Sequence, residues 1–117
     1  MTLQIYGIPN CATCKKALQW LDINVVDFEF INLKEKPPSR KEIESWVAVL
    51  GYKAMRNTSG QSYRALGDEK LEWTEEQWID AFAKDAMLIK RPLFLDDEEP
   101  IHVGFRQPQD LREKLRL

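Results

Sequence analysis

Two cysteines near the start of the chain, Cys11 and Cys14, are the residues whose type and spacing point most directly to chemistry. They lie in the stretch "IYGIPNCATCKKALQWL", residues 5–21, after an apolar run and before a helical pattern. Such a pair can form a structural disulfide, supply half of a metal site, or provide a reactive thiol with a second thiol as its partner. What the chain does depends on which of these three holds.

Composition argues against the first two interpretations. The 117 residues are 44% hydrophobic and 31% charged, with a net charge of −2, which fits one soluble domain and gives no reason to expect direct binding to nucleic acid. No leader-like segment and no apolar run of spanning length occurs, so we expect a cytoplasmic protein without a membrane span, where lasting disulfides are uncommon. A structural zinc site takes four ligands, whereas the chain offers two cysteines and one histidine, His102. We therefore expect no metal.

The reactive-thiol interpretation has a physical basis at the start of a helix. Unpaired N–H groups in the first turn favour a thiolate on Cys11 by about 0.3–1 kcal/mol, and at most by about 2. That is roughly one pKa unit, too little to ionise most of a thiol whose ordinary pKa is about 8.5. A nearby cation must therefore add to it. Lys15 and Lys16 are close in sequence, but an arginine folded back from a distant segment would serve better.

Position separates the two thiols. Cys11, at the helix tip, is expected to be the exposed nucleophile, and Cys14, one turn further along the same face, to be partly covered. Two interpretations of Cys14 stay open. It either attacks a mixed disulfide on Cys11 and releases the product, or it is a small packing residue beside a single working thiol.

The elements expected around the pair follow the order β-α-β, then helices, then β-β-α. The pattern predicts a strand over Leu3–Tyr6, a helix over about Cys11–Asp22 capped by Asn10, and a strand over Val25–Leu33 parallel to the first.

The middle of the chain carries two capping-box signatures. Ser39 with Glu42 starts a helix that Gly51 ends, and Thr74 with Gln77 starts another. The segment "IKRPLFLDDEEPIHVGF" predicts two strands around an acidic turn, and Asp110–Leu117 predicts a closing helix.

These stretches together resemble the arsenate reductase family of glutaredoxin-coupled enzymes, with its relatives, the Spx-type regulators and reductase-like proteins of unknown role. The resemblance runs almost end to end and rests on the opening stretch and on "MRNTSG", "LIKRPLFL" and "VGFRQP". It implies an α/β, thioredoxin-like fold (β-α-β then β-β-α) in one domain over residues 1–117, with a helical insertion over about residues 38–87.

The resemblance also implies roles for particular residues. Cys11 matches the nucleophile, and Pro92 matches a proline that is typically cis and faces it. Substrate binding is expected from residues that flank the thiol or carry a guanidinium suited to a tetrahedral oxyanion: Asn10, Lys15, Arg56, Arg91 and Arg106. For Arg56 and for Arg91 an ordinary surface position stays open. His102 is expected to face solvent or a backbone group.

Departures from the reductase pattern leave three hypotheses open. Cys14 and Lys15 stand where many reductases carry serine and arginine, and Ser59 stands where relatives of unknown role carry arginine. The first hypothesis is an arsenate-reductase-like enzyme with no bound cofactor, which takes electrons from glutathione and glutaredoxin (or thioredoxin). The second is a glutathione-linked reductase of another small oxyanion or thiol substrate. The third is a redox-switched regulator of the Spx type, which binds the C-terminal domain of the RNA polymerase α-subunit.

Overall fold

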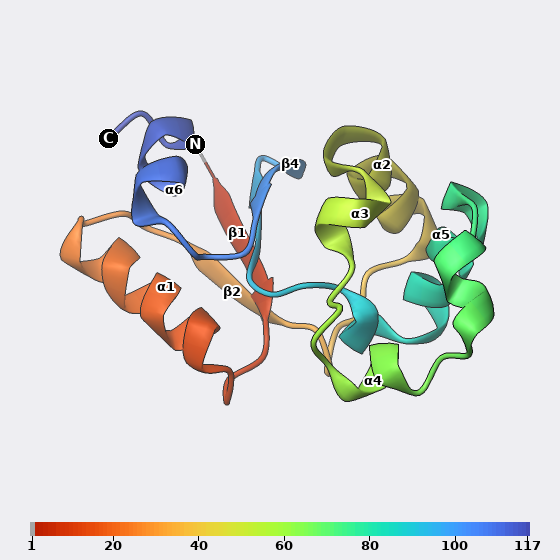
Figure 1. Ribbon diagram of the computed structural model, residues 1–117. Helices are drawn as coiled ribbons and strands as arrows, with labels where there is room; N and C mark the ends of the chain where they lie inside the picture. Colours follow the sequence, from red (N-terminus) through yellow and green to blue (C-terminus); the bar gives the residue numbers. More distant parts are fainter. Residues whose placement is uncertain (1) are drawn as a thin grey trace. The chain divides into compact units, whose positions relative to one another are not determined.

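The computed structural model describes residues 2–117, and the chain divides into two compact units (Figure 1). The sheet unit comprises the chain up to Asn32 together with Arg91–Leu117, and the helical unit comprises Leu33–Lys90. The helical unit extends a few residues beyond both ends of the insertion expected over residues 38–87.

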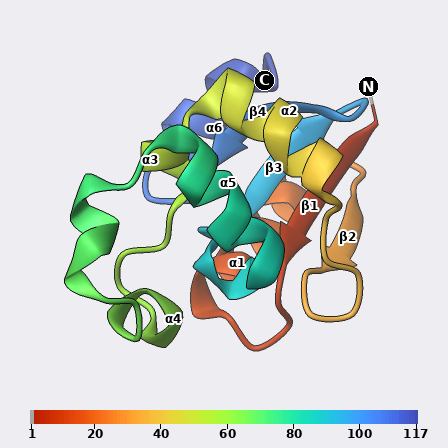
Figure 2. The same cartoon turned by 90° about the vertical axis from the view of Figure 1, so that its right-hand side faces the viewer.

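The sheet unit is built on four strands in the order β2-β1-β3-β4. Their bounds are β1 (Leu3–Gly7), β2 (Glu29–Asn32), β3 (Leu93–Asp96) and β4 (Glu99–Val103). β1 pairs with β2 in parallel, while β3 pairs with β1 and β4 antiparallel; the turned view in Figure 2 shows β2, β1 and β3 side by side. The predicted β-α-β and β-β-α order is therefore confirmed.

Two helices, α1 (Ala12–Ile23) and α6 (Pro108–Lys114), cover one face of this sheet (Figure 1). Alternate residues of β1 point to that face, because side chains along a strand alternate between the two faces of a sheet. The resulting apolar core collects residues from β1, β3, α1 and α6 with its C-cap residue, namely Leu3, Ile5, Ala17, Leu21, Phe94, Leu111 and Leu115. This core fixes the start of α1 relative to the end of β1, where the cysteines lie.

Several element boundaries in the sheet unit differ from the sequence-based expectation, among them the end of α6, which lies at Lys114 rather than Leu117. β2 begins at Glu29 rather than Val25, because the N–H groups of Val25 and Val26 still bond to carbonyls of α1 and Val25 has a left-handed φ of 56°. α6 begins at Pro108 rather than Asp110, since a proline fits the first turn of a helix, where its missing N–H is not needed.

The helical unit contains four α-helices, α2 (Arg40–Leu50), α3 (Tyr52–Met55), α4 (Gln61–Arg64) and α5 (Glu75–Lys84), and two short 3-10 turns, η1 (Asp68–Glu72) and η2 (Ala86–Leu88). Both predicted capping boxes are present, with the side chains of Ser39 and Thr74 accepting the N–H groups of Glu42 and Gln77. Gly51 ends α2 with a φ of 83°, a conformation that favours glycine.

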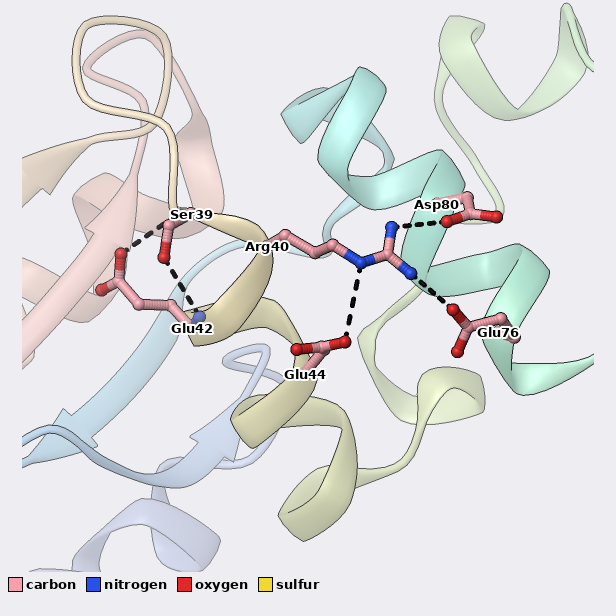
Figure 3. Close-up of polar contacts among 6 residues, drawn as sticks. All are labelled: Ser39, Arg40, Glu42, Glu44, Glu76 and Asp80. Carbon is pink, nitrogen blue, oxygen red and sulfur yellow. Dashed lines mark hydrogen bonds and ion pairs between the residues drawn. The ribbon is translucent and has the colours of Figure 1, made fainter.

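One arginine links α2 to α5 on the surface of the helical unit (Figure 3). Arg40 Nη2 lies 2.6 Å from Glu76, Nη1 bonds to Asp80, and Nε lies 3.5 Å from Glu44. The pKa of Arg40 is raised, mainly by its hydrogen bond to Asp80. All four side chains are exposed, so solvent screens their attraction.

In the part of the chain that the structure describes, no helix is long and apolar enough to cross a membrane.

Candidate active site

Cys11 occupies the N-cap position of α1. Its backbone is extended (φ −103°, ψ 120°), and its carbonyl accepts the N–H of Lys15 at 3.0 Å, the first bond of the helix. Its own N–H bonds back to the Ile8 carbonyl at 3.4 Å, which closes a turn between β1 and α1. This turn shifts the cap by one residue, so the prediction that Asn10 caps the helix was wrong.

The surroundings of the half-buried Cys11 thiol favour its anion. Partial burial by itself raises the pKa, but the N–H groups of Cys14 and Thr13, the Cys14 thiol and the charge of Arg91 act against it. The net result is a pKa below the ordinary thiol value. The thiol makes no capping hydrogen bond of standard geometry. The N–H groups therefore act through their proximity and their aligned dipoles.

The surroundings of Cys14, in contrast, favour its neutral thiol. Its side chain is 1% exposed, and burial is the main reason why its pKa is raised to about 11. Its hydrogen bond to Cys11 and the charge of Cys11 raise the pKa further, while the Ile8 N–H and Arg91 lower it. With that pKa only about one Cys14 thiol in 10⁴ is ionised at pH 7. Both cysteines are free thiols, and the pair divides into an anion-favouring sulfur and a neutral S–H partner.

Arg91 supplies the charge that acts on both sulfurs. It lies two residues before β3, and its Nε is buried. The Arg91–Pro92 peptide bond is cis, the conformation that the resemblance implies, and the Pro92 carbonyl accepts the Gly104 N–H at 2.7 Å. The cation thus comes from a distant arginine. The two lysines that follow Cys14 in sequence, Lys15 and Lys16, are exposed on α1.

The other residues expected to bind substrate lie in different surroundings. Asn10, Lys15 and Arg106 are exposed, the last in the segment between β4 and α6. Their roles in substrate binding stay predictions.

Arg56 belongs to the helical unit, where its guanidinium lies over two aromatic rings. Its Cζ is 5.3 Å from the Trp78 ring centre and 5.7 Å from that of Tyr52, and its backbone forms an antiparallel bridge with Ile89. Stacking on rings is a favourable use of a guanidinium without any bound anion. Its role as an oxyanion ligand stays a prediction.

His102 packs close to the C-terminal helix. Its Nδ1 lies 2.9 Å from Lys114 Nζ, and its ring lies 5.8 Å from that of Phe94. Among residues 2–117, no three histidine, cysteine or acidic side chains gather closely enough to hold a metal ion.

Sequence reasoning missed Gly7, the last residue of β1, which lies directly against the Cys14 sulfur. A glycine in a strand often marks a close approach of another group to the backbone. That signal was available in the sequence, but it does not say which group approaches.

Comparisons with known proteins agree on one family. The model of the ArsC family matches residues 6–112. The uncharacterized protein YusI of Bacillus subtilis is 40% identical over 113 residues, which cover 93% of this chain and 95% of that protein. The global transcriptional regulator Spx of Streptococcus pyogenes is 29% identical over 103 residues, which cover 86% of this chain and 76% of the regulator.

Solved structures give the same picture. The structure of a possible arsenate reductase from Streptococcus mutans has a TM-score of 0.83 at 37% identity, covering 94% of this chain and 97% of that one. An arsenate reductase from Vibrio cholerae has a TM-score of 0.80, covers 97% of each chain and is 24% identical, so it shows the fold alone. The α/β, thioredoxin-like fold expected from the sequence is confirmed.

Proposed function

The chain belongs to the ArsC family, and from this premise we propose that it is a thiol-dependent reductase in which Cys11 is the nucleophile. One observation carries the proposal. Cys11 stands at the tip of α1 with a pKa below the ordinary value, and Arg91 acts on the same sulfur. An anionic sulfur beside a guanidinium can attack an oxidised centre whose negative oxygens the guanidinium binds.

The proposed substrate is a small oxyanion, with arsenate as the first choice. Arg91 offers planar paired donors, and the free N–H groups at the start of α1 add a partial positive charge. Arg106 and Arg56 are the further arginines that the resemblance assigns to oxyanion binding. The similarity to a possible arsenate reductase at 37% identity supports this choice of substrate.

The reaction balances with one external thiol. Cys11 sulfur bonds to arsenic and displaces water, and glutathione then attacks the Cys11 sulfur as arsenic leaves with two more electrons. The sum is arsenate plus two thiols giving arsenite, a Cys11–glutathione disulfide and water. Glutaredoxin would then reduce that disulfide. An external thiol suits this step, because so little Cys14 is ionised at rest. These reductants place the proposed reaction in the cytoplasm.

A second candidate function is redox-controlled binding to the C-terminal domain of the RNA polymerase α-subunit. Two observations favour it: a Cys-x-x-Cys pair whose thiols differ in ionisation, and similarity over most of the chain to regulators named Spx. In this case oxidation of Cys11 and Cys14 to a disulfide, rather than turnover, would carry the function.

A coupled assay separates the candidates. Arsenate, glutathione and glutaredoxin are supplied to the wild-type chain and to Cys11→Ser, and arsenite is measured. We expect turnover by the wild type alone. If the wild type gives no arsenite, even with thioredoxin added, arsenate is not the substrate.

The same preparations test the alternatives. A Cys11–glutathione disulfide that glutaredoxin reduces, without arsenate turnover, would point to another substrate. Retention of the polymerase domain by the oxidised chain but not by the reduced chain, or the reverse, would favour the regulator. Equal retention of both forms would remove it.

A further inference from the structure

The Cys14 sulfur lies against Gly7, in the space that a side chain on this residue would need. A Cβ built on Gly7 would lie 2.7 Å from Cys14 Sγ and 3.2 Å from Phe30 Cε1. Real Cβ atoms essentially never come within 3.0 Å of a heavy atom outside their own and the adjacent residues, so an alanine at this position would force something to move.

The backbone of Gly7 does not itself require glycine. Among the described residues, the glycines with a left-handed φ are Gly51 and Gly104. Gly7 ends β1 in regular parallel pairing, opposite Asn32. The reason for glycine here is therefore space, and the atom that occupies the space is a thiol sulfur of the proposed redox pair.

We propose that Gly7 is a positioning residue for the redox pair, because the space it leaves sets how deeply Cys14 is buried and therefore when Cys14 reacts with a sulfur on Cys11. The inference rests on the proposed function only in its assumption that a mixed disulfide forms on Cys11.

The depth of Cys14 matters because burial is the largest of the influences that keep it protonated. The other two are the charge of Cys11 and a hydrogen bond to it. A mixed disulfide on Cys11 removes that charge and weakens that acceptor. Burial is then what still opposes ionisation, against the Ile8 N–H and Arg91, which favour it. Gly7 thus sets the depth of burial, which is what still keeps Cys14 protonated once Cys11 carries a mixed disulfide.

The step that follows needs no further oxidant. Cys14 gives its proton to solvent, its sulfur bonds to the Cys11 sulfur, and the bond from Cys11 to the external thiol breaks. The external thiol leaves as a thiolate and takes up a proton. The Cys11–Cys14 disulfide holds the two oxidising equivalents that the mixed disulfide carried.

The first test reads the ionisation of Cys14 alone. In a Cys11→Ser chain, the ultraviolet absorbance of the Cys14 thiolate is followed against pH, with the Cys11→Ser/Cys14→Ala chain subtracted. We expect Gly7→Ala to lower the apparent pKa by about one unit, a tenfold gain in thiolate at neutral pH. Gly67→Ala is the matched control, because a Cβ there meets the flexible, exposed Glu69 carboxylate and no thiol. An unchanged Cys14 titration in a folded Gly7→Ala chain would overturn the proposal.

Neither this titration nor the next test includes substrate or reductant. A failed arsenate assay would therefore leave both results intact, and their failure would leave a positive arsenate assay intact.

The second test identifies the atom that Gly7 accommodates, and it remains decisive if Gly7→Ala is poorly folded by itself. The urea midpoint is measured for Gly7→Ala in the wild-type chain and in Cys14→Ala, where the sulfur is gone. We expect Gly7→Ala to lower the midpoint clearly in the first case and by less than a third as much in the second. Equal losses would assign the space to Phe30 or the backbone and would overturn the proposal.

Discussion

The sheet unit and the helical unit each contain an arginine that the resemblance assigns to the same task, yet the two lie in different surroundings. In the sheet unit, Arg91 lies two residues before β3 and its charge acts on both thiols. In the helical unit, Arg56 lies over the rings of Tyr52 and Trp78. The two guanidinium groups therefore have different neighbours, a pair of thiols in one unit and aromatic rings in the other. The difference teaches that the neighbours of a guanidinium decide its role.

The largest expected effect is the loss of stability when the aromatic cluster beneath Arg56 is disrupted. Trp78 is 0% exposed and contacts the rings of Tyr52, Tyr63, Trp73 and Phe82. Trp78→Ala should lower the free energy of unfolding by about 3–5 kcal/mol, because it removes a large buried side chain and leaves a cavity. Urea denaturation measures this. Leu71→Ala, at a side chain that is 72% exposed, is the control and should change little. A loss below about 1 kcal/mol would show that Trp78 does not organise the cluster.

In the sheet unit, the ionisation of Cys14 should make stability depend on pH. Its pKa in the folded chain, about 11, is above that of an unfolded thiol, about 8.5. The folded chain therefore keeps its proton over a range in which the unfolded chain has lost it. This stabilisation is complete below about pH 8.5 and is lost as the pH rises toward 11, by an amount on the order of 3 kcal/mol.

Cys14→Ala should remove that slope. The free energy of unfolding is measured at several values between about pH 8 and 11 for both chains, and their slopes rather than their absolute stabilities are compared. Parallel slopes would mean that Cys14 is not held protonated by the fold.

A smaller effect on the free energy of unfolding should distinguish Arg56 from Arg91. Arg56→Ala should lower the free energy of unfolding by about 1 kcal/mol, the usual size of a partly exposed contact between a guanidinium and aromatic rings. Arg56→Lys should recover only part of this, because an ammonium lacks the planar face that stacks. If Arg56→Ala instead raises the pKa of Cys11, as we expect Arg91→Ala to do, the two arginines share one role and the contrast between the units fails.

The surface contacts of Arg40 should give the smallest effect. Arg40→Ala removes its bonds to Glu44, Glu76 and Asp80, but all of these groups are exposed. The urea midpoint should fall slightly at low salt, and the difference should shrink further at high salt. A large loss that salt does not reduce would mean that Arg40 holds α2 and α5 together by packing rather than by charge.

The features that could be predicted from the sequence are the local ones. Ser39 with Glu42, and Thr74 with Gln77, identify two helix starts because a capping box needs only residues three apart. The strand start predicted at Val25 was wrong, although it also rested on local sequence preference. Valine favours strands, but here the hydrogen bonds that close α1 extend over Val25 and Val26 and outweigh that preference.

The contacts within the site were beyond sequence reasoning, because they join residues far apart in the chain. Periodicity and composition give no sign that Arg91 acts on Cys11 while Arg56 stacks on rings; the family resemblance named both for one task. The contact of Gly7 with Cys14 likewise depends on how α1 packs beside β1. The need for a cation at Cys11 could be predicted, since the start of a helix shifts a pKa by only about one unit.

The central claim is that Arg91 stabilises the Cys11 thiolate at the start of α1, and the pH dependence of Cys11 alkylation tests it most directly. The rate of reaction with iodoacetamide is measured by mass spectrometry for the wild type, Arg91→Ala, Arg91→Lys and the control Lys16→Ala. We expect a wild-type apparent pKa below the ordinary thiol value, a rise in Arg91→Ala, a partial return in Arg91→Lys and no change in Lys16→Ala. A wild-type pKa at the ordinary value, or one that Arg91→Ala leaves unchanged, would contradict the claim.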